Sequence, residues 1–352
     1  MSKRSRSGSI TRLQKLIGAI KDRASLSKAA MFSCTTNRAN PNAISIVKST
    51  THDYSAPPPD KHLSALLSSS SRASRAAAAS TVHALMSRLH RTRDAAVALK
   101  CLIVVHLVVK RGPFILQDQV SVYPWSGGRN YLNMSGFRDD RTHAKWVLSA
   151  FVRWHAGYVE QLLSTSRELG FFVGALSNST DKDKEEERAS SSSVKDLLRE
   201  ARSMTDLVEE ICQTPDYLHG DDEAKKLISE VVGLVGSDYL SLVNDLSLRL
   251  TELQTRDSLS QFDDSVQLAR VLTRLERCKE KLATLFGYEK VSVQTFWSLV
   301  DEMKEKLGYV RDDDKRLMRS TESARFGERV VSHGDSVRFS SSRFSSTKIQ
   351  GL

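Results

Sequence analysis

Apolar residues recur along this chain with the spacing of helices. In one typical stretch the apolar positions fall on a single helix face, three or four residues apart. They are Leu197, Leu198, Ala201, Met204, Leu207, Val208 and Ile211. No segment alternates apolar and polar residues for long enough to predict a β-strand. We therefore expect an all-α protein whose successive antiparallel helices stack as a solenoid and continue into a bundle.

The same pattern predicts the extent of each helix. The expected ranges are 42–51, 61–70, 73–90, 94–110, 141–166, 194–214, 223–255 with a break at Gly236, 263–286 and 292–307. The helix over 94–110 is apolar on nearly every side, so it should be central and buried. Lys100 and His106 lie on it. We expect both to be hydrogen-bonded structural residues rather than ligands of a bound molecule.

Residues 1–33 predict a basic amphipathic helix. Its aliphatic stripe and the lysines beside it are Leu13, Leu16, Ile17, Ile20, Lys15 and Lys21. Such a helix either packs its stripe on the rest of the domain or lies in a membrane interface, where lysines meet anionic headgroups. The sequence leaves both interpretations open.

Two other segments lack the apolar pattern of packed helices. Residues 176–193 are charged and rich in serine, which predicts a flexible link. Residues 311–352 are rich in serine and arginine, which predicts a disordered tail. The expected organisation is thus an N-terminal part over 20–175, the link, further helices over 194–310, and the tail.

Charge divides the chain into two unlike halves. The net charge is +10. Lys and Arg outnumber Asp and Glu by 25 to 9 in residues 1–175, but are outnumbered by 33 to 27 in residues 176–352. A basic half suits a phosphate-bearing partner, either an anionic membrane or nucleic acid. Few aromatic residues accompany the basic ones, so nucleic-acid binding is the less favoured alternative.

The sequence carries no common catalytic or nucleotide-binding signature. It has no nucleophile elbow, phosphate loop or dinucleotide-binding turn, so we do not expect an enzyme. The nine histidines are scattered and the four cysteines lie far apart, which predicts reduced thiols and neither a metal nor another cofactor. We also expect no secretory signal and no transmembrane helix, because no apolar run approaches the ~20 residues needed.

One short stretch sets basic residues on both sides of a proline turn. Lys48 and His52 are four residues apart, so at the end of a helix their side chains leave the same face. The three prolines at 57–59 cannot continue that helix, and they lead the chain to Lys61 and His62. These side chains could converge and hold a multiply charged anion. On spacing alone, ordinary solvated charges at a helix end are the alternative.

This stretch resembles the lipid-binding element of the ANTH domain, found in clathrin assembly proteins. In that family a lysine and a Thr-Thr-His sequence lead to a basic cluster that holds phosphatidylinositol 4,5-bisphosphate. Lys48, His52, Lys61 and His62 match those positions. The loop is one residue longer here, and Pro59 stands where the family usually has another lysine. Weaker or less selective lipid binding is therefore expected.

The resemblance extends well beyond this loop. The stretches 91–112, 132–137 and 150–158 are similar to further blocks of the family, in the same order. Together the matches cover roughly residues 20 to 310, although the C-terminal half resembles the family only in its helical pattern. The resemblance implies a right-handed helical solenoid of the ENTH/ANTH kind.

The resemblance also implies a function. It implies a peripheral adaptor in clathrin-mediated endocytosis, with Lys48, Lys61 and His62 holding lipid phosphates and His52 ordering or extending the site. The implied partners are a phosphoinositide membrane, clathrin, a SNARE protein and an adaptor complex, with no nucleic acid. The implied location is the cytoplasmic face of the plasma membrane, in coated pits and vesicles, and the Golgi. A helical protein scaffold that needs no lipid is a further alternative.

Overall fold

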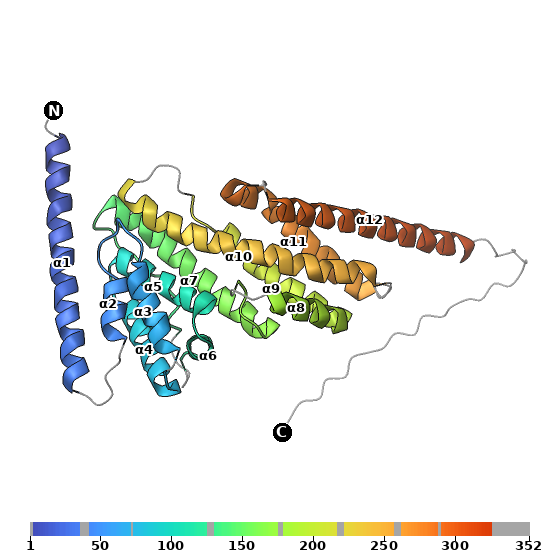
Figure 1. Cartoon of the computed structure of the whole chain (residues 1–352). Coiled ribbons are helices and arrows are strands. Elements are labelled where there is room, and N and C mark those ends of the chain that lie inside the picture. The colour runs from blue at the N-terminus through green and yellow to red at the C-terminus, as the bar shows by residue number, and fades with distance from the viewer. Residues whose placement is uncertain are drawn as a thin grey trace, which may run out of the picture. The chain divides into compact units, whose positions relative to one another are not determined.

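The computed structural model describes residues 3–35, 42–71, 73–124, 130–174, 179–216, 222–256, 262–287 and 290–325. Every regular element in these ranges is a helix. The helices are α1 (Lys3–Thr35), α2 (Ala43–Ser49), α3 (Asp60–Ser70), α4 (Arg75–Arg91), α5 (Ala95–Arg111), α6 (Phe114–Ser121), α7 (His143–Leu169), α8 (Ser179–Ser191), α9 (Val194–Cys212), α10 (Asp222–Thr255), α11 (Phe262–Phe286) and α12 (Val291–Arg325) (Figure 1). The chain forms two compact units, residues 1–305 and residues 306–352.

Helices of the first unit pack on their neighbours in chain order. α2 contacts α3, α4 contacts α5, α5 contacts α7, and α7 contacts α9 (Figure 1). α9 in turn contacts both α10 and α11. These contacts bury the apolar faces of the helices named, as in a helical solenoid that passes into a bundle. The predicted fold class is confirmed.

The central helix is α5, as its composition predicts. Every residue from Ala95 to Lys110 is buried. Asp94 caps its N-terminus by accepting hydrogen bonds from the backbone N–H groups of Ala96 and Val97. α5 packs on α4, α6 and α7, so it is the central helix of the first half of the solenoid.

A buried polar network joins α5 and α7 to α10. The Asp238 carboxylate on α10 contacts His106 Nε2 at 2.5 Å and accepts from the Tyr158 hydroxyl at 2.8 Å. Lys110 also donates to it. Burial alone would raise the pKa of Asp238, but the His106 and Lys110 charges bring it below its usual value. The network therefore contains a charged carboxylate that depends on its partners.

Residues 179–191 form α8, where a flexible link was predicted for 176–193. Ala189 is 1% exposed, and Arg188 donates to Glu200 Oε1 of α9 at 2.7 Å. Arg249 of α10 pairs with Glu185 of α8 and with Glu200. The partners lie on other helices, so the local composition of the segment gave no sign of them.

The expected break at Gly236 is also absent, because α10 is continuous from Asp222 to Thr255. A Cβ at Gly236 would lie 2.9 Å from a ring carbon of Phe286. This glycine therefore permits close packing rather than a bend.

The last helix is longer than predicted. α12 continues to Arg325, whereas we expected the helix to end at residue 307 and a tail to begin at 311. Residues 326–352 lie outside the described residues, and the predicted tail is untested there.

Candidate anion-binding site

The two ends of the α2–α3 connection carry the predicted basic residues. Lys48 lies in the last turn of α2, and Lys61 and His62 lie in the first turn of α3. Pro59 stands at the N-cap of α3 with φ −67° and ψ 128°. The proline ring fixes this φ, and the extended ψ leads directly into the helix that begins at Asp60.

The structure places Lys48 and Lys61 near enough to His62 for their charges to act on its imidazole. The pKa of His62 is lowered, first by burial and then by the positive charges of Lys48 and Lys61. Lys48 and Lys61 are exposed, and no acidic group of the described residues pairs with either lysine within 4.0 Å. The two lysine charges therefore oppose protonation of the His62 imidazole at a solvent-facing position. A multiply charged anion would offset that effect.

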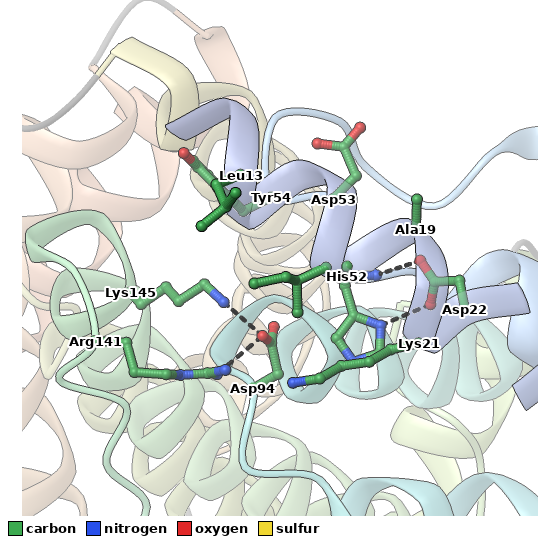
Figure 2. Close-up of a pocket in the computed structure, with 12 residues that line it drawn as sticks. Leu13, Ala19, Lys21, Asp22, His52, Asp53, Tyr54, Asp94, Arg141 and Lys145 are labelled. Carbon is green, nitrogen blue, oxygen red and sulfur yellow. Dashed lines mark hydrogen bonds and ion pairs between the residues drawn. The ribbon is translucent and has the colours of Figure 1, made fainter. Parts of the chain in front are cut away.

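His52 has a different environment. Its Nδ1 atom lies 2.6 Å from Asp22 Oδ1 of α1, and its backbone N–H donates to Asp22 Oδ2 at 3.0 Å (Figure 2). A Cβ at Gly18 would lie 3.1 Å from the His52 Cβ, so the missing side chain lets α1 approach. His52 thus joins the α2–α3 loop to α1. Its role in ordering or extending the site stays a prediction.

Two further basic residues hold the backbone of this loop. Arg88 of α4 donates to Thr50 Oγ1 at 2.6 Å and to the Thr50 carbonyl at 2.7 Å. Lys100 of α5 donates to Thr51 Oγ1 at 2.9 Å and to the Asp53 carbonyl at 2.5 Å. Burial lowers the pKa of Lys100 to about 8. Both side chains hydrogen-bond the loop. Lys100 is thus a hydrogen-bonded structural residue, as expected, whereas sequence reasoning missed Arg88.

The aliphatic stripe of α1 lies on the surface. The exposed fractions of Leu13, Leu16, Ile17 and Ile20 are 61%, 62%, 45% and 68%. Lys21 is exposed as well, and the Lys15 side chain lies outside the described residues. Leu13 and Ile17 also line a cavity beside α1, and α1 packs on α2, so the stripe is partly turned toward the rest of the unit. Contact of its exposed part with a membrane interface stays a prediction from the sequence.

A cavity of about 580 Å³ lies between α1 and the body of the first unit. Figure 2 shows Asp22 and His52 on one side of it, and Asp94, Arg141 and Lys145 on the other. Asp94, Arg141 and Lys145 form a second charged cluster, in which both basic groups pair with the Asp94 carboxylate. Lys21 of α1 also lines this cavity, and no acidic group of the described residues pairs with it within 4.0 Å. The cavity therefore presents one exposed lysine beside the paired cluster.

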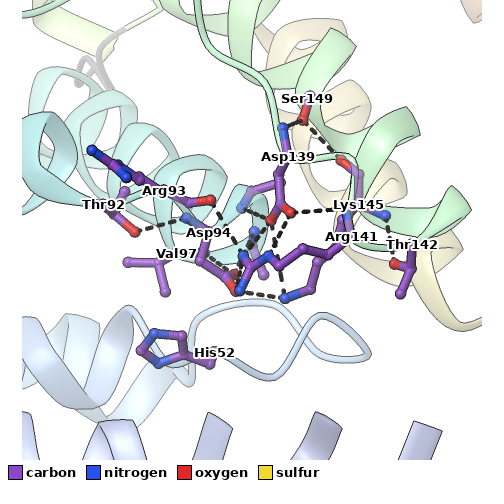
Figure 3. Close-up of polar contacts among 12 residues, drawn as sticks. His52, Thr92, Arg93, Asp94, Val97, Asp139, Arg141, Thr142, Lys145 and Ser149 are labelled. Atoms are coloured by element: carbon purple, nitrogen blue, oxygen red, sulfur yellow. Dashed lines mark hydrogen bonds and ion pairs between the residues drawn. The ribbon is translucent and has the colours of Figure 1, made fainter. Parts of the chain in front are cut away.

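The second cluster holds the start of α5 to the start of α7 (Figure 3). Lys145 donates to Asp94 Oδ2 at 2.5 Å, and Arg141 does so at 2.9 Å. Arg141 also donates to Asp139, which accepts the Ala95 N–H at 3.0 Å. Burial would raise the pKa of Asp94, but the Lys145 hydrogen bond and charge lower it overall. The second charged cluster therefore stabilises the packing of α5 against α7.

The model of the ANTH domain matches residues 42–290. This chain belongs to the ANTH domain family. The match begins just before α2 and includes Lys48, Lys61 and His62. Among the described residues, no helix combines the length and the apolar character needed to cross a bilayer.

Three relatives of this ANTH protein each cover more than four fifths of its length. The Arabidopsis thaliana protein named "Putative clathrin assembly protein At4g40080" is 44% identical over 96% of both chains. A second Arabidopsis protein of the same description, At5g10410, is 32% identical over 82% of this chain and 84% of its own. A third, At5g65370, is 29% identical over 84% of this chain and 99% of its own.

Proposed function

We propose that this chain is a peripheral membrane adaptor that binds phosphatidylinositol 4,5-bisphosphate and promotes clathrin coat assembly. The observation that carries the proposal is the group formed by Lys48, Lys61 and His62. Two exposed lysines, neither paired with an acidic group in the part of the chain that the structure describes, lie near one half-buried imidazole at the junction of α2 and α3. Charge-assisted hydrogen bonds to phosphate are the strongest contacts that such a group can make.

The geometry of α1 supports attachment to the same membrane. Its exposed aliphatic stripe could enter the interface, while Lys21 and the lysines of the site meet anionic headgroups. Each basic residue near such a surface contributes about 1 kcal/mol. Attachment of one molecule is then weak and reversible, and a coat that gathers many copies would strengthen it through avidity.

The clathrin part of the proposal rests on the relatives, whose names describe clathrin assembly proteins. The 44% identical relative aligns over 96% of both chains, so the same domain organisation supports the same role. We propose a non-enzymatic adaptor at clathrin-coated pits and vesicles, on the cytoplasmic face of the plasma membrane. A Golgi location and the binding of a SNARE helix or an adaptor complex stay predictions of the family resemblance.

Vesicle sedimentation with the unmodified chain tests the lipid part. The chain is expected to pellet with vesicles that contain phosphatidylinositol 4,5-bisphosphate more than with phosphatidylserine vesicles of equal total charge. Clustered phosphates can contact Lys48, Lys61 and His62 at once, whereas a diffuse surface charge cannot. The pelleted fraction should fall as salt is added, because the Debye length shortens to about 8 Å at physiological ionic strength.

Equal binding to both vesicle types would contradict a headgroup site and leave only general electrostatic attraction. Adding purified clathrin to the same vesicles tests the second part separately. Clathrin is expected in the pellet only when the adaptor and the phosphoinositide are both present. Lipid binding without clathrin recruitment would remove the coat-assembly role while leaving the lipid site intact.

A further inference from the structure

The cavity beside α1 has an apolar wall built from two parts of the chain. α1 contributes Leu13, Ile17 and Ala19, and the α2–α3 connection contributes Tyr54 (Figure 2). Leu13 and Ile17 are four residues apart, so they lie on one line along the helix. Their exposed fractions of 61% and 45% leave much of both side chains uncovered. At about 580 Å³, the cavity is in the size range of sites for small organic ligands.

The charged groups of the lining leave one cation available. Lys21 lies four residues beyond Ile17 on the same line of α1, and it is exposed. Figure 2 shows its side chain extending into the cavity. The carboxylates of the lining are each engaged by a neighbouring donor: Asp22 by His52, Asp94 by Lys145, and Asp53 by the Ser55 hydroxyl. The cavity thus joins an apolar wall to one available positive charge, which fits an anionic amphiphile.

We propose that this cavity binds one anionic phospholipid of the membrane, with an acyl chain against Leu13 and Ile17 and the phosphodiester beside Lys21. The inference rests on the proposed membrane attachment, because the lipid must come from the bilayer. Leu16 and Ile20 of the same helix are 62% and 68% exposed and lie outside the lining. When they enter the interface, the cavity lies at the depth where acyl chains meet headgroups.

This site differs in chemistry from the group formed by Lys48, Lys61 and His62. One lysine matches the single charge of a phosphodiester, whereas that group suits clustered phosphates. Burial of an acyl chain is favourable in proportion to the apolar area that it removes from water. The chain, rather than the headgroup, should therefore supply most of the affinity. A bound lipid would also add contacts between α1 and the α2–α3 connection.

Dihexanoylphosphatidylglycerol, used below its critical micelle concentration, is a soluble probe with two short chains and one phosphodiester. Titrated into the full chain, it is expected to shift the methyl resonances of Leu13 and Ile17 saturably, and those of Leu16 and Ile20 much less. Glycerophosphoglycerol, which is the same headgroup without chains, should cause no shift. Dihexanoylphosphatidylcholine has the same chains but no net charge, so it should bind about fivefold more weakly.

Three variants of α1 make the result specific. Ala19→Trp fills the cavity and should abolish the saturable shifts. Ala24→Trp, at an exposed position outside the lining, should keep them. Lys21→Gln should weaken binding of the phosphatidylglycerol probe to the level of the phosphatidylcholine probe.

Several outcomes would overturn the inference. Equal shifts at all four aliphatic residues would show unspecific adsorption to the stripe of α1. The absence of a saturable shift, or shifts unchanged in Ala19→Trp, would exclude a lipid from the cavity. Each of these results leaves the headgroup site standing when the chain still pellets with phosphatidylinositol 4,5-bisphosphate vesicles. Saturable binding of the probe without selective pelleting would instead support the cavity site and remove the headgroup site.

Discussion

Binding of phosphatidylinositol 4,5-bisphosphate vesicles by the double variant Lys48→Glu, Lys61→Glu is expected to fall roughly a thousandfold. Loss of two cations near an anionic surface removes about 2 kcal/mol, and the two introduced carboxylates oppose binding by about as much again. The sum, about 4 kcal/mol, corresponds to that factor in the partition coefficient. Titration of the chain with vesicles, followed by sedimentation, measures it.

A charge-matched control separates the local site from overall charge. Lys195 on α9 and Lys226 on α10 are exposed and lie outside the anion-binding site. Their replacement by Glu changes the net charge by the same amount, but should reduce vesicle binding far less. Equal losses in the two double variants would mean that Lys48 and Lys61 act only through the total charge of the chain.

Asp238→Asn is expected to have the largest effect on folding. The carboxylate is fully buried and neutralises Lys110, which is itself only 5% exposed. An amide of similar size leaves that ammonium group without a counter-charge and weakens the contacts with His106 and Tyr158. Breaking a buried ion pair on one side costs about 3–5 kcal/mol. Urea unfolding at neutral pH should show a midpoint lowered accordingly.

The pH dependence gives this prediction a second test. Because the folded-state pKa of Asp238 is lowered, its stabilising contribution is present above the unfolded value of about 3.9 and is lost as pH falls through the folded value. The free energy of unfolding of Asp238→Asn should therefore approach that of the unmodified chain as the pH falls.

Asp216→Asn serves as the control, because it removes the partner of Lys281 at a carboxylate that is 77% exposed. It should cost less than about 1 kcal/mol. Similar losses for Asp238→Asn and the control would refute a buried charge network.

Much of the fold could be predicted because helix periodicity is a local property. The uninterrupted apolar run of α5 predicted a central helix, and all its residues from Ala95 to Lys110 are buried. The helical state of residues 179–191 was missed because it depends on Arg249 and Glu200, which follow on later helices. The polar composition of a segment does not show which distant groups will neutralise its charges.

In the candidate site, too, features formed by neighbouring residues could be predicted, and contacts between distant residues could not. Lys48, Lys61 and His62 could be grouped from sequence, because a proline turn returns the chain over a short distance. The pairing of His52 with Asp22 spans 30 residues, and the contact of Arg88 with Thr50 spans 38. Neither has a local signal. Sequence thus indicated which groups could hold phosphate, and the structure added the contacts that hold the loop.

Magnetic resonance titration of the His62 ring tests the central claim most directly. In the free chain, burial and the charges of Lys48 and Lys61 keep the pKa of His62 below 6.5. The soluble inositol trisphosphate headgroup should neutralise those lysines and raise the pKa of His62, with resonances assigned through His62→Gln. By linkage, binding should then strengthen as pH falls toward that pKa. An unchanged pKa of His62 at saturating headgroup would show that the phosphates bind elsewhere.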